Sequence, residues 1–105
     1  MSTPARPSTL PADFDFQAVI PAWSVSVSPP EITRVFTFVN FERAFEFMTL
    51  SAQYANEIDH HPDWSNVWNK VNVHLSTHSA KALTELDILM AQAMDRFAQQ
   101  VMLAT

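Results

Sequence analysis

The chain has 105 residues, 48% hydrophobic and 16% charged, which is the size and composition of one globular domain with a single core. Its net charge is −5 and its six basic residues lie far apart in sequence, so we expect no direct binding of nucleic acid. It has no cysteine and no glycine, which excludes disulfides, thiolate metal sites and glycine-rich phosphate loops. Without glycine, tight turns are expected at proline, Asn or Asp. No apolar run approaches the roughly 18 residues of a membrane span, and the N-terminus lacks the apolar segment of a signal peptide. We therefore expect a cytoplasmic protein without membrane contact.

The first residues form a proline-rich segment. Prolines among small polar residues resist regular structure, so 1–12 is predicted to be a flexible arm ahead of one domain at 13–105. Residues 13–20 contain enough apolar positions for two helical turns, which Pro21 would end.

Two strand patterns follow. Residues 23–28 alternate apolar and polar positions, which places Trp23, Val25 and Val27 on one face of a sheet. Residues 32–39 are rich in β-branched and aromatic side chains. Because only a short break separates the two segments, we expect a hairpin.

Two longer segments follow the 3.6-residue period of an amphipathic helix. Asn40 can cap the first, whose apolar stripe consists of Phe41, Ala44, Phe45, Met48, Ala52 and Ala55. The second begins at the capping box 84–87 and continues with the apolar positions Met90, Met94, Phe97, Ala98 and Val101.

Another strand pattern lies between these helices, where Val71, Val73 and Leu75 alternate with polar residues. Hairpins and helices are segregated in the sequence and do not alternate regularly. This arrangement predicts an α+β fold in which helices cover one face of an antiparallel sheet.

Three of the four histidines fall in loops or at a strand end. His60 and His61 follow the first long helix, and His78 follows the strand at 71–75. Imidazoles gain and lose protons near neutral pH, so two or three around one cavity can protonate a leaving hydroxyl and accept a proton from a neighbouring nitrogen. Dehydration needs both a proton donor and a proton acceptor. His74 is interpreted as a surface or hydrogen-bonded side chain, because the alternation places it with polar neighbours.

These candidates have alternative interpretations. Three histidines also suggest zinc, but adjacent His60 and His61 rarely both reach one ion and no HExxH spacing occurs, so we expect no metal and no cofactor. Trp64 and Trp68 could stack on a flat heterocycle or belong to the core. Asp87 can cap the second helix, and spacing alone gives it no other role.

A longer segment carries a resemblance to a known family. Residues 59–71, with the sequence DHHPDWSNVWNKV, are followed by LSTH at 75–78 and by Asp87. This pattern resembles the pterin-4a-carbinolamine dehydratases, and the similarity extends upstream through FTFVNFERAFEFM at 36–48. The resemblance implies a four-stranded antiparallel sheet with three helices on one face, in the order α-β-β-α-β-β-α. It also implies a homodimer or homotetramer.

The resemblance further implies an activity, namely dehydration of 4a-hydroxytetrahydropterin to quinonoid dihydropterin, which recycles the pterin used by an aromatic amino acid hydroxylase. The implied catalytic residues are His60, His61, His78 and Asp87. The implied pterin-binding residues are Asp59, Pro62, Trp64, Ser76 and Thr77. Two other roles stay open: a regulatory module that helps a transcription factor to dimerise, and a role in molybdopterin metabolism.

This chain departs from the family pattern at three positions. Asn56 stands where an acidic residue is common, four positions before the first histidine, and Glu57 is displaced from that position by one. Leu86 stands where arginine is frequent, and Ala82 where glycine is frequent. We therefore expect that a supporting carboxylate is missing or displaced.

Overall fold

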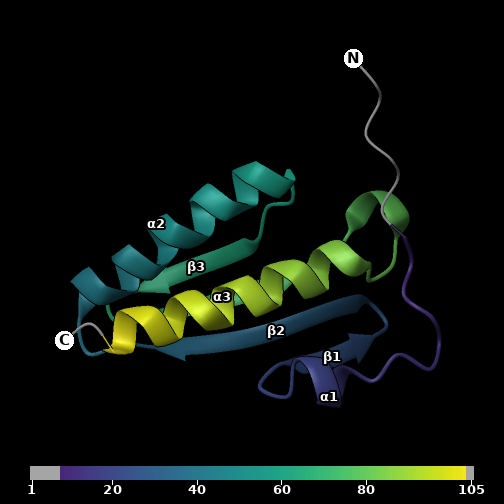
Figure 1. Cartoon of the computed structure of the whole chain (residues 1–105), viewed down its shortest axis with the longest axis horizontal. Coiled ribbons are helices and arrows are strands. Elements are labelled where there is room, and N and C mark those ends of the chain that lie inside the picture. The colour runs from purple at the N-terminus through teal and green to yellow at the C-terminus, as the bar shows by residue number, and fades with distance from the viewer. Residues whose placement is uncertain (1–7, 104–105) are drawn as a thin grey trace.

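The structure, a computed structural model, describes residues 8–103 and contains a four-stranded antiparallel sheet (Figure 1). Its helices are α1 (Phe16–Val19), α2 (Phe41–Ile58), the short 3₁₀ helix η1 (His78–Ala80) and α3 (Glu85–Leu103). Its strands are β1 (Ser24–Val27), β2 (Pro30–Thr37), β3 (Asp63–Val67) and β4 (Lys70–Leu75). The predicted α+β class and the order α-β-β-α-β-β-α are confirmed. None of the described helices is long and apolar enough to cross a membrane.

The strand order is β1-β2-β4-β3, so two hairpins meet through their inner strands. In the register of β2 with β4, Ile32 lies opposite Leu75. In the register of β3 with β4, Asp63 lies opposite His74. Because neighbouring strands are antiparallel, the beginnings of β2 and β3 and the end of β4 lie at the same end of the sheet.

Helices α2 and α3 pack together over one face of the sheet (Figure 1). Most of the fully buried core side chains come from β2, β4 and both long helices, and Ile20 joins them from the end of α1. The largest include Phe36, Phe47, Ile32, Leu75, Met90 and Met94. The stripe predicted for α3 is confirmed, with Phe97 half-buried at its margin.

The stripe predicted for α2 is wrong in part. Phe41 and Phe45 are 44% and 56% exposed, and their rings contact each other, whereas Phe47 and Ser51 are fully buried. The predicted and observed stripes both follow the helical period and share Ala44 and Ala55, but the observed stripe is rotated about the helix axis toward Phe47 and Ser51. Contacts with α3 and β4 select the observed stripe.

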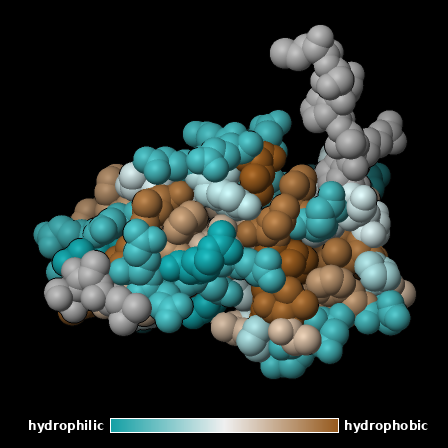
Figure 2. All heavy atoms as spheres, viewed as in Figure 1, coloured by the Kyte–Doolittle hydropathy of each residue, from teal (hydrophilic) through white to brown (hydrophobic). Residues whose placement is uncertain are grey.

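The first hairpin is confirmed, and a polar contact ties it to α3. Trp23 is buried, and its Nε1 donates to Asp95 Oδ1 at 2.9 Å, while Arg34 donates to the same oxygen at 2.6 Å. Val25 lies opposite Ile32 but is 39% exposed, because β1 is an edge strand that the two long helices do not fully cover. Figure 2 shows apolar side chains over the first turns of α3 and beside β1, with hydrophilic ones over the later turns of α3.

The segment before β1 differs from expectation in one respect. Helix α1 has a single turn, capped by the Asp15 side chain, in place of the predicted two turns. Ser8 O accepts from Glu85 N at 3.4 Å, and Leu10 N donates to Leu83 O at 3.2 Å. Residues 1–7 of the predicted arm lie outside the described residues, and the boundary at residue 12 stays a prediction.

Left-handed backbone occurs within residues 8–103 at Asp59 (φ 50°), Trp68 (φ 51°) and Lys81 (φ 52°). Asp tolerates this conformation better than most residues, so Asp59 fits the expectation. The expectation is wrong for Trp68 and Lys81, because a chain without glycine has to place other side chains in these turns.

Candidate active site

A cavity of about 290 Å³ opens at the end of the sheet where β2 and β3 begin and β4 ends. Its volume is near the lower end of the roughly 300–1,000 Å³ typical of small-molecule sites. Three imidazoles, two carboxylates and one hydroxyl contribute to its walls. The lining residues are Glu31, His61, Pro62, Asp63, His74, Ser76 and His78.

The end of α2 separates the two adjacent histidines. The left-handed turn at Asp59 ends the helix, and the backbone N–H groups of Asp59 and His60 both donate to Ala55 O. His60 is only 9% exposed, whereas His61 is exposed and lines the cavity. His61 Nε2 lies 2.9 Å from Asn56 Oδ1, one turn back on α2. The group that supports His61 is therefore an amide, at the position where the resemblance led us to expect a carboxylate.

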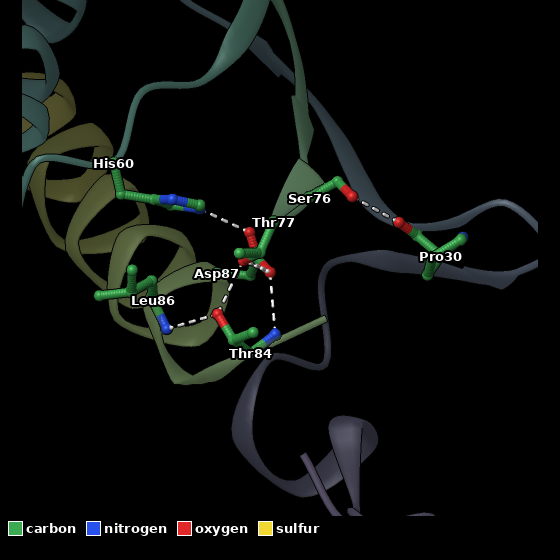
Figure 3. A network of polar contacts seen from close by, with 7 residues as sticks. All are labelled: Pro30, His60, Ser76, Thr77, Thr84, Leu86 and Asp87. Carbon is green, nitrogen blue, oxygen red and sulfur yellow. Dashed lines mark hydrogen bonds and ion pairs between the residues drawn. The ribbon is translucent and has the colours of Figure 1, made fainter. Parts of the chain in front are cut away.

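A buried hydrogen-bond network lies beside the cavity, centred on Asp87 (Figure 3). Asp87 is fully buried; its Oδ1 accepts from His60 Nε2 at 2.7 Å, and its Oδ2 accepts from Thr77 Oγ1 at 2.8 Å and from Thr84 N at 3.0 Å. Thr84 Oγ1 accepts from Leu86 N at 3.3 Å, so the side chains of Thr84 and Asp87 both cap the start of α3. One carboxylate thus caps α3 and orients His60.

The same network fixes the segment after β4. Ser76 Oγ donates to Pro30 O at 2.7 Å and ties the end of β4 to the beginning of β2 (Figure 3). Thr77 is buried, and its hydroxyl donates to Asp87. These two bonds precede His78, which is exposed at the start of η1 and lines the cavity. His78 is therefore a surface side chain on an anchored backbone.

The predicted site residues fall into three groups. Those in the cavity wall are His61, Pro62, Ser76 and His78. Those in the buried network are His60, Thr77 and Asp87. Asp59 is exposed at the helix end and Trp64 packs against the hydrophobic core, so neither lines the cavity. Trp68 is 63% exposed in the turn between β3 and β4, at the opposite end of β3 from His61.

Sequence reasoning did not assign three residues of the cavity wall to the site: Glu31, Asp63 and His74. His74 is partly exposed, as expected of a surface side chain, but it also lines the cavity, because β4 is a central strand whose polar face contributes to the cavity between β2 and β3. His74 Nδ1 lies 3.4 Å from Glu31 Oε1. A signal was present in the sequence: His74 and Ser76 are two residues apart and share a strand face, and Ser76 was already a site candidate.

Among the described residues, no three His, Asp or Glu side chains are arranged to hold a metal ion. Catalysis without metal stays a prediction that chelation can test.

Comparison with known proteins places the chain in a family. The family model described as "Pterin 4 alpha carbinolamine dehydratase" matches residues 10–97. The chain belongs to this family. It is 46% identical over 80 residues to a protein of Rhizorhabdus wittichii, covering 76% of this chain and 82% of the relative. It is 49% identical over 76 residues to one of Sinorhizobium fredii, covering 72% of each. Both relatives are named "Putative pterin-4-alpha-carbinolamine dehydratase".

Solved structures of the family have the same fold. A protein of Brucella melitensis described as "transcriptional coactivator/pterin dehydratase" superposes with a TM-score of 0.74 at 44% identity, over 77% of this chain and 86% of that one. A "pterin dehydratase-like protein" described as a RuBisCO assembly factor of the alpha-carboxysome has a TM-score of 0.65 at 23% identity, over 73% of this chain and 89% of that one. The second likeness shows the fold alone. Since these names assign different functions to one fold, function has to be argued from the site.

Proposed function

We propose that this protein is a cytoplasmic hydro-lyase that converts 4a-hydroxytetrahydropterin to quinonoid dihydropterin, the step that returns the oxidised product of an aromatic amino acid hydroxylase to the pterin cycle. The observation that carries the proposal is the convergence of His61 and His78, which come from separate elements, on one cavity of about 290 Å³. Membership of the pterin dehydratase family supports a pterin as the substrate.

The reaction requires one proton donor and one proton acceptor. The bond from C4a to the hydroxyl oxygen breaks as that oxygen takes a proton and leaves as water. N5 loses its proton, and the electron pair of the N5–H bond forms the C4a=N5 double bond. A protonated and a neutral imidazole meet both needs, and the reaction consumes no net proton. His61 and His78 have these two roles in the proposal.

The buried residues have a positioning role in this proposal. His60 and Asp87 contact each other at 2.7 Å and do not line the cavity. Their network joins the loop that carries His61 to the segment that carries His78, so it sets the separation of the two imidazoles. Pro62 and Ser76 lie in the wall, where they can contact the pterin.

The decisive experiment measures dehydration of chemically generated 4a-hydroxytetrahydropterin, after subtraction of its spontaneous rate. General acid–base groups typically contribute about 10²- to 10⁴-fold, so His61→Ala and His78→Ala should each lower turnover on that scale. Because the two imidazoles can partly substitute for one another, the double variant should not show additive losses.

The matched control is Lys70→Ala, an exposed position at the other end of β4. His74→Ala cannot serve as the control, because His74 lines the cavity. If His61→Ala and His78→Ala keep full turnover with unchanged circular dichroism, these residues are not the acid–base pair. A binding or regulatory module then becomes the better interpretation.

A further inference from the structure

The fourth histidine of the chain lies in the same cavity as His61 and His78. His74 projects from β4 on the sheet face that the helices leave open, and its side chain is 40% exposed. Its Nδ1 lies 3.4 Å from Glu31 Oε1, and the Glu31 side chain is 32% exposed. Both residues line the cavity, so an imidazole–carboxylate pair faces the space proposed for the pterin.

The partners of the cavity imidazoles differ in chemistry. His61 contacts the amide of Asn56, whose oxygen accepts a hydrogen bond but carries no charge. His74 Nδ1 lies 3.4 Å from a carboxylate oxygen of Glu31, a group that accepts hydrogen bonds and carries a negative charge when ionised. The other pairing of this kind within residues 8–103, His60 with Asp87, is buried and does not line the cavity. Glu31 therefore brings to the cavity the negative charge that Asn56 does not provide.

The remaining charged groups around His74 are few. Asp63 on β3 is its opposite neighbour in the register and also lines the cavity. On the side of the open sheet face, His74 borders a second hollow that includes Arg34. The Arg34 guanidinium is paired with Asp95 at 2.6 Å, which offsets its charge. The titratable groups that share the cavity with His74 are thus two carboxylates and the two other imidazoles.

We propose that Glu31 and His74 form an additional proton-donating couple beside His61 and His78, which deepens the proposed function and rests on it. His74 is the catalytic residue and Glu31 is its positioning residue. With Nδ1 directed at Glu31, Nε2 is the nitrogen that serves the substrate. The Nε2 proton passes to the 4a-hydroxyl, the C4a–O bond breaks, and water leaves. The N5 proton passes to His61 or His78, and the C4a=N5 bond forms, so that atoms and charge balance.

The test compares three variants in the dehydration assay. Glu31→Gln and His74→Gln should each lower kcat by about 10- to 100-fold with little change in KM, because both act after the substrate has bound and because the remaining imidazoles can partly substitute for the lost donor. Their double variant should lose little more than the worse single one. Glu42→Gln is the matched control: it makes the same chemical change at an exposed position of α2 that does not line the cavity.

A rescue separates this role from a structural one. Asn56→Asp in the Glu31→Gln background places a carboxylate beside His61, and it should restore part of kcat and alter the pH profile. Full turnover in both Glu31→Gln and His74→Gln would overturn the couple, as would a rise in KM alone.

Failure of the proposed function can be distinguished from failure of the couple. If the wild-type protein does not dehydrate the substrate, the proposed function is wrong. The couple is then judged by calorimetry of 7,8-dihydropterin binding in two buffers of different ionisation enthalpy. If the wild-type protein exchanges protons with the buffer on binding and the Glu31→Gln variant does not, the Glu31–His74 couple is supported. If the wild-type protein exchanges no proton on binding, the couple is refuted.

Discussion

Replacing Asp87 by alanine removes the acceptor of three buried hydrogen bonds. His60 Nε2 and Thr84 N would lose their acceptor, and Thr77 Oγ1 would keep only its contact with Thr84 Oγ1 at 2.7 Å. Asp87 is fully buried, so bulk water cannot readily replace its carboxylate. Each unsatisfied buried donor costs about 1–3 kcal/mol. Allowing for partial relaxation, we expect Asp87→Ala to lower the free energy of unfolding by about 4 kcal/mol, or the Tm by roughly 16–32 °C.

Asparagine at the same position should cost much less. Its amide oxygen can accept from Thr77 and Thr84, and its amide nitrogen can donate to His60 Nε2. This arrangement requires the His60 proton to be on Nδ1, the opposite tautomer to the one that Asp87 selects. We expect Asp87→Asn to cost about 1–2 kcal/mol, mainly through loss of the charge-assisted bonds.

Urea unfolding followed by circular dichroism measures both values, and nitrogen NMR of the histidine rings measures the tautomer. Because Asp87→Ala removes much of the stability of a small domain, Thr77→Val provides a milder perturbation with an expected cost of about 1–2 kcal/mol. Asp13→Asn is the control, since Asp13 is exposed. An Asp87→Ala protein within about 1 kcal/mol of wild type would refute the assignment of Asp87 as the centre of the network.

Three further outcomes are expected. Treatment with EDTA should leave turnover unchanged, because imidazole acid–base transfer needs no Lewis acid; loss of activity that zinc restores would contradict this. Light scattering at micromolar concentration should give the mass of a dimer or tetramer, because β1 and β3 leave unpaired edges; a monomer mass would exclude it. Asn40→Ala should lower the free energy of unfolding by about 1 kcal/mol, because the Asn40 side chain accepts from Arg43 N at 2.9 Å; an unchanged denaturation midpoint would show that this cap contributes nothing.

The parts of the fold that local chemistry determines could be predicted from the sequence. The Asn40 cap and the box at 84–87 mark where the long helices begin, and both form the expected hydrogen bonds. The rotation of α2 about its own axis could not be predicted, because the stripes containing Phe45 and Phe47 have the same period. Only contact with α3 and β4 distinguishes them, and that contact is non-local.

The candidate site also has residues that could be predicted from the sequence and residues that could not. The resemblance supplied His61 and His78, and the structure brings both to one cavity. The resemblance could not supply Glu31, because this residue lies 43 positions before His74 in the sequence and reaches it only through the pairing of β2 with β4. Asp87 was ambiguous in the sequence because a helix cap and a histidine partner both require a carboxylate, and here one side chain has both roles.

The three tryptophans occupy three different environments, and this has a spectroscopic consequence. Trp23 is 5% exposed and donates to Asp95, Trp64 packs against the core, and Trp68 is 63% exposed in a turn. An aqueous quencher such as iodide reaches the Trp68 indole and is kept from the Trp23 indole. The quenched part of the emission therefore reports on the β3–β4 turn, and the protected part reports on the contact between the first hairpin and α3. Detachment of that hairpin should become visible as newly quenchable fluorescence, even while the rest of the sheet stays folded.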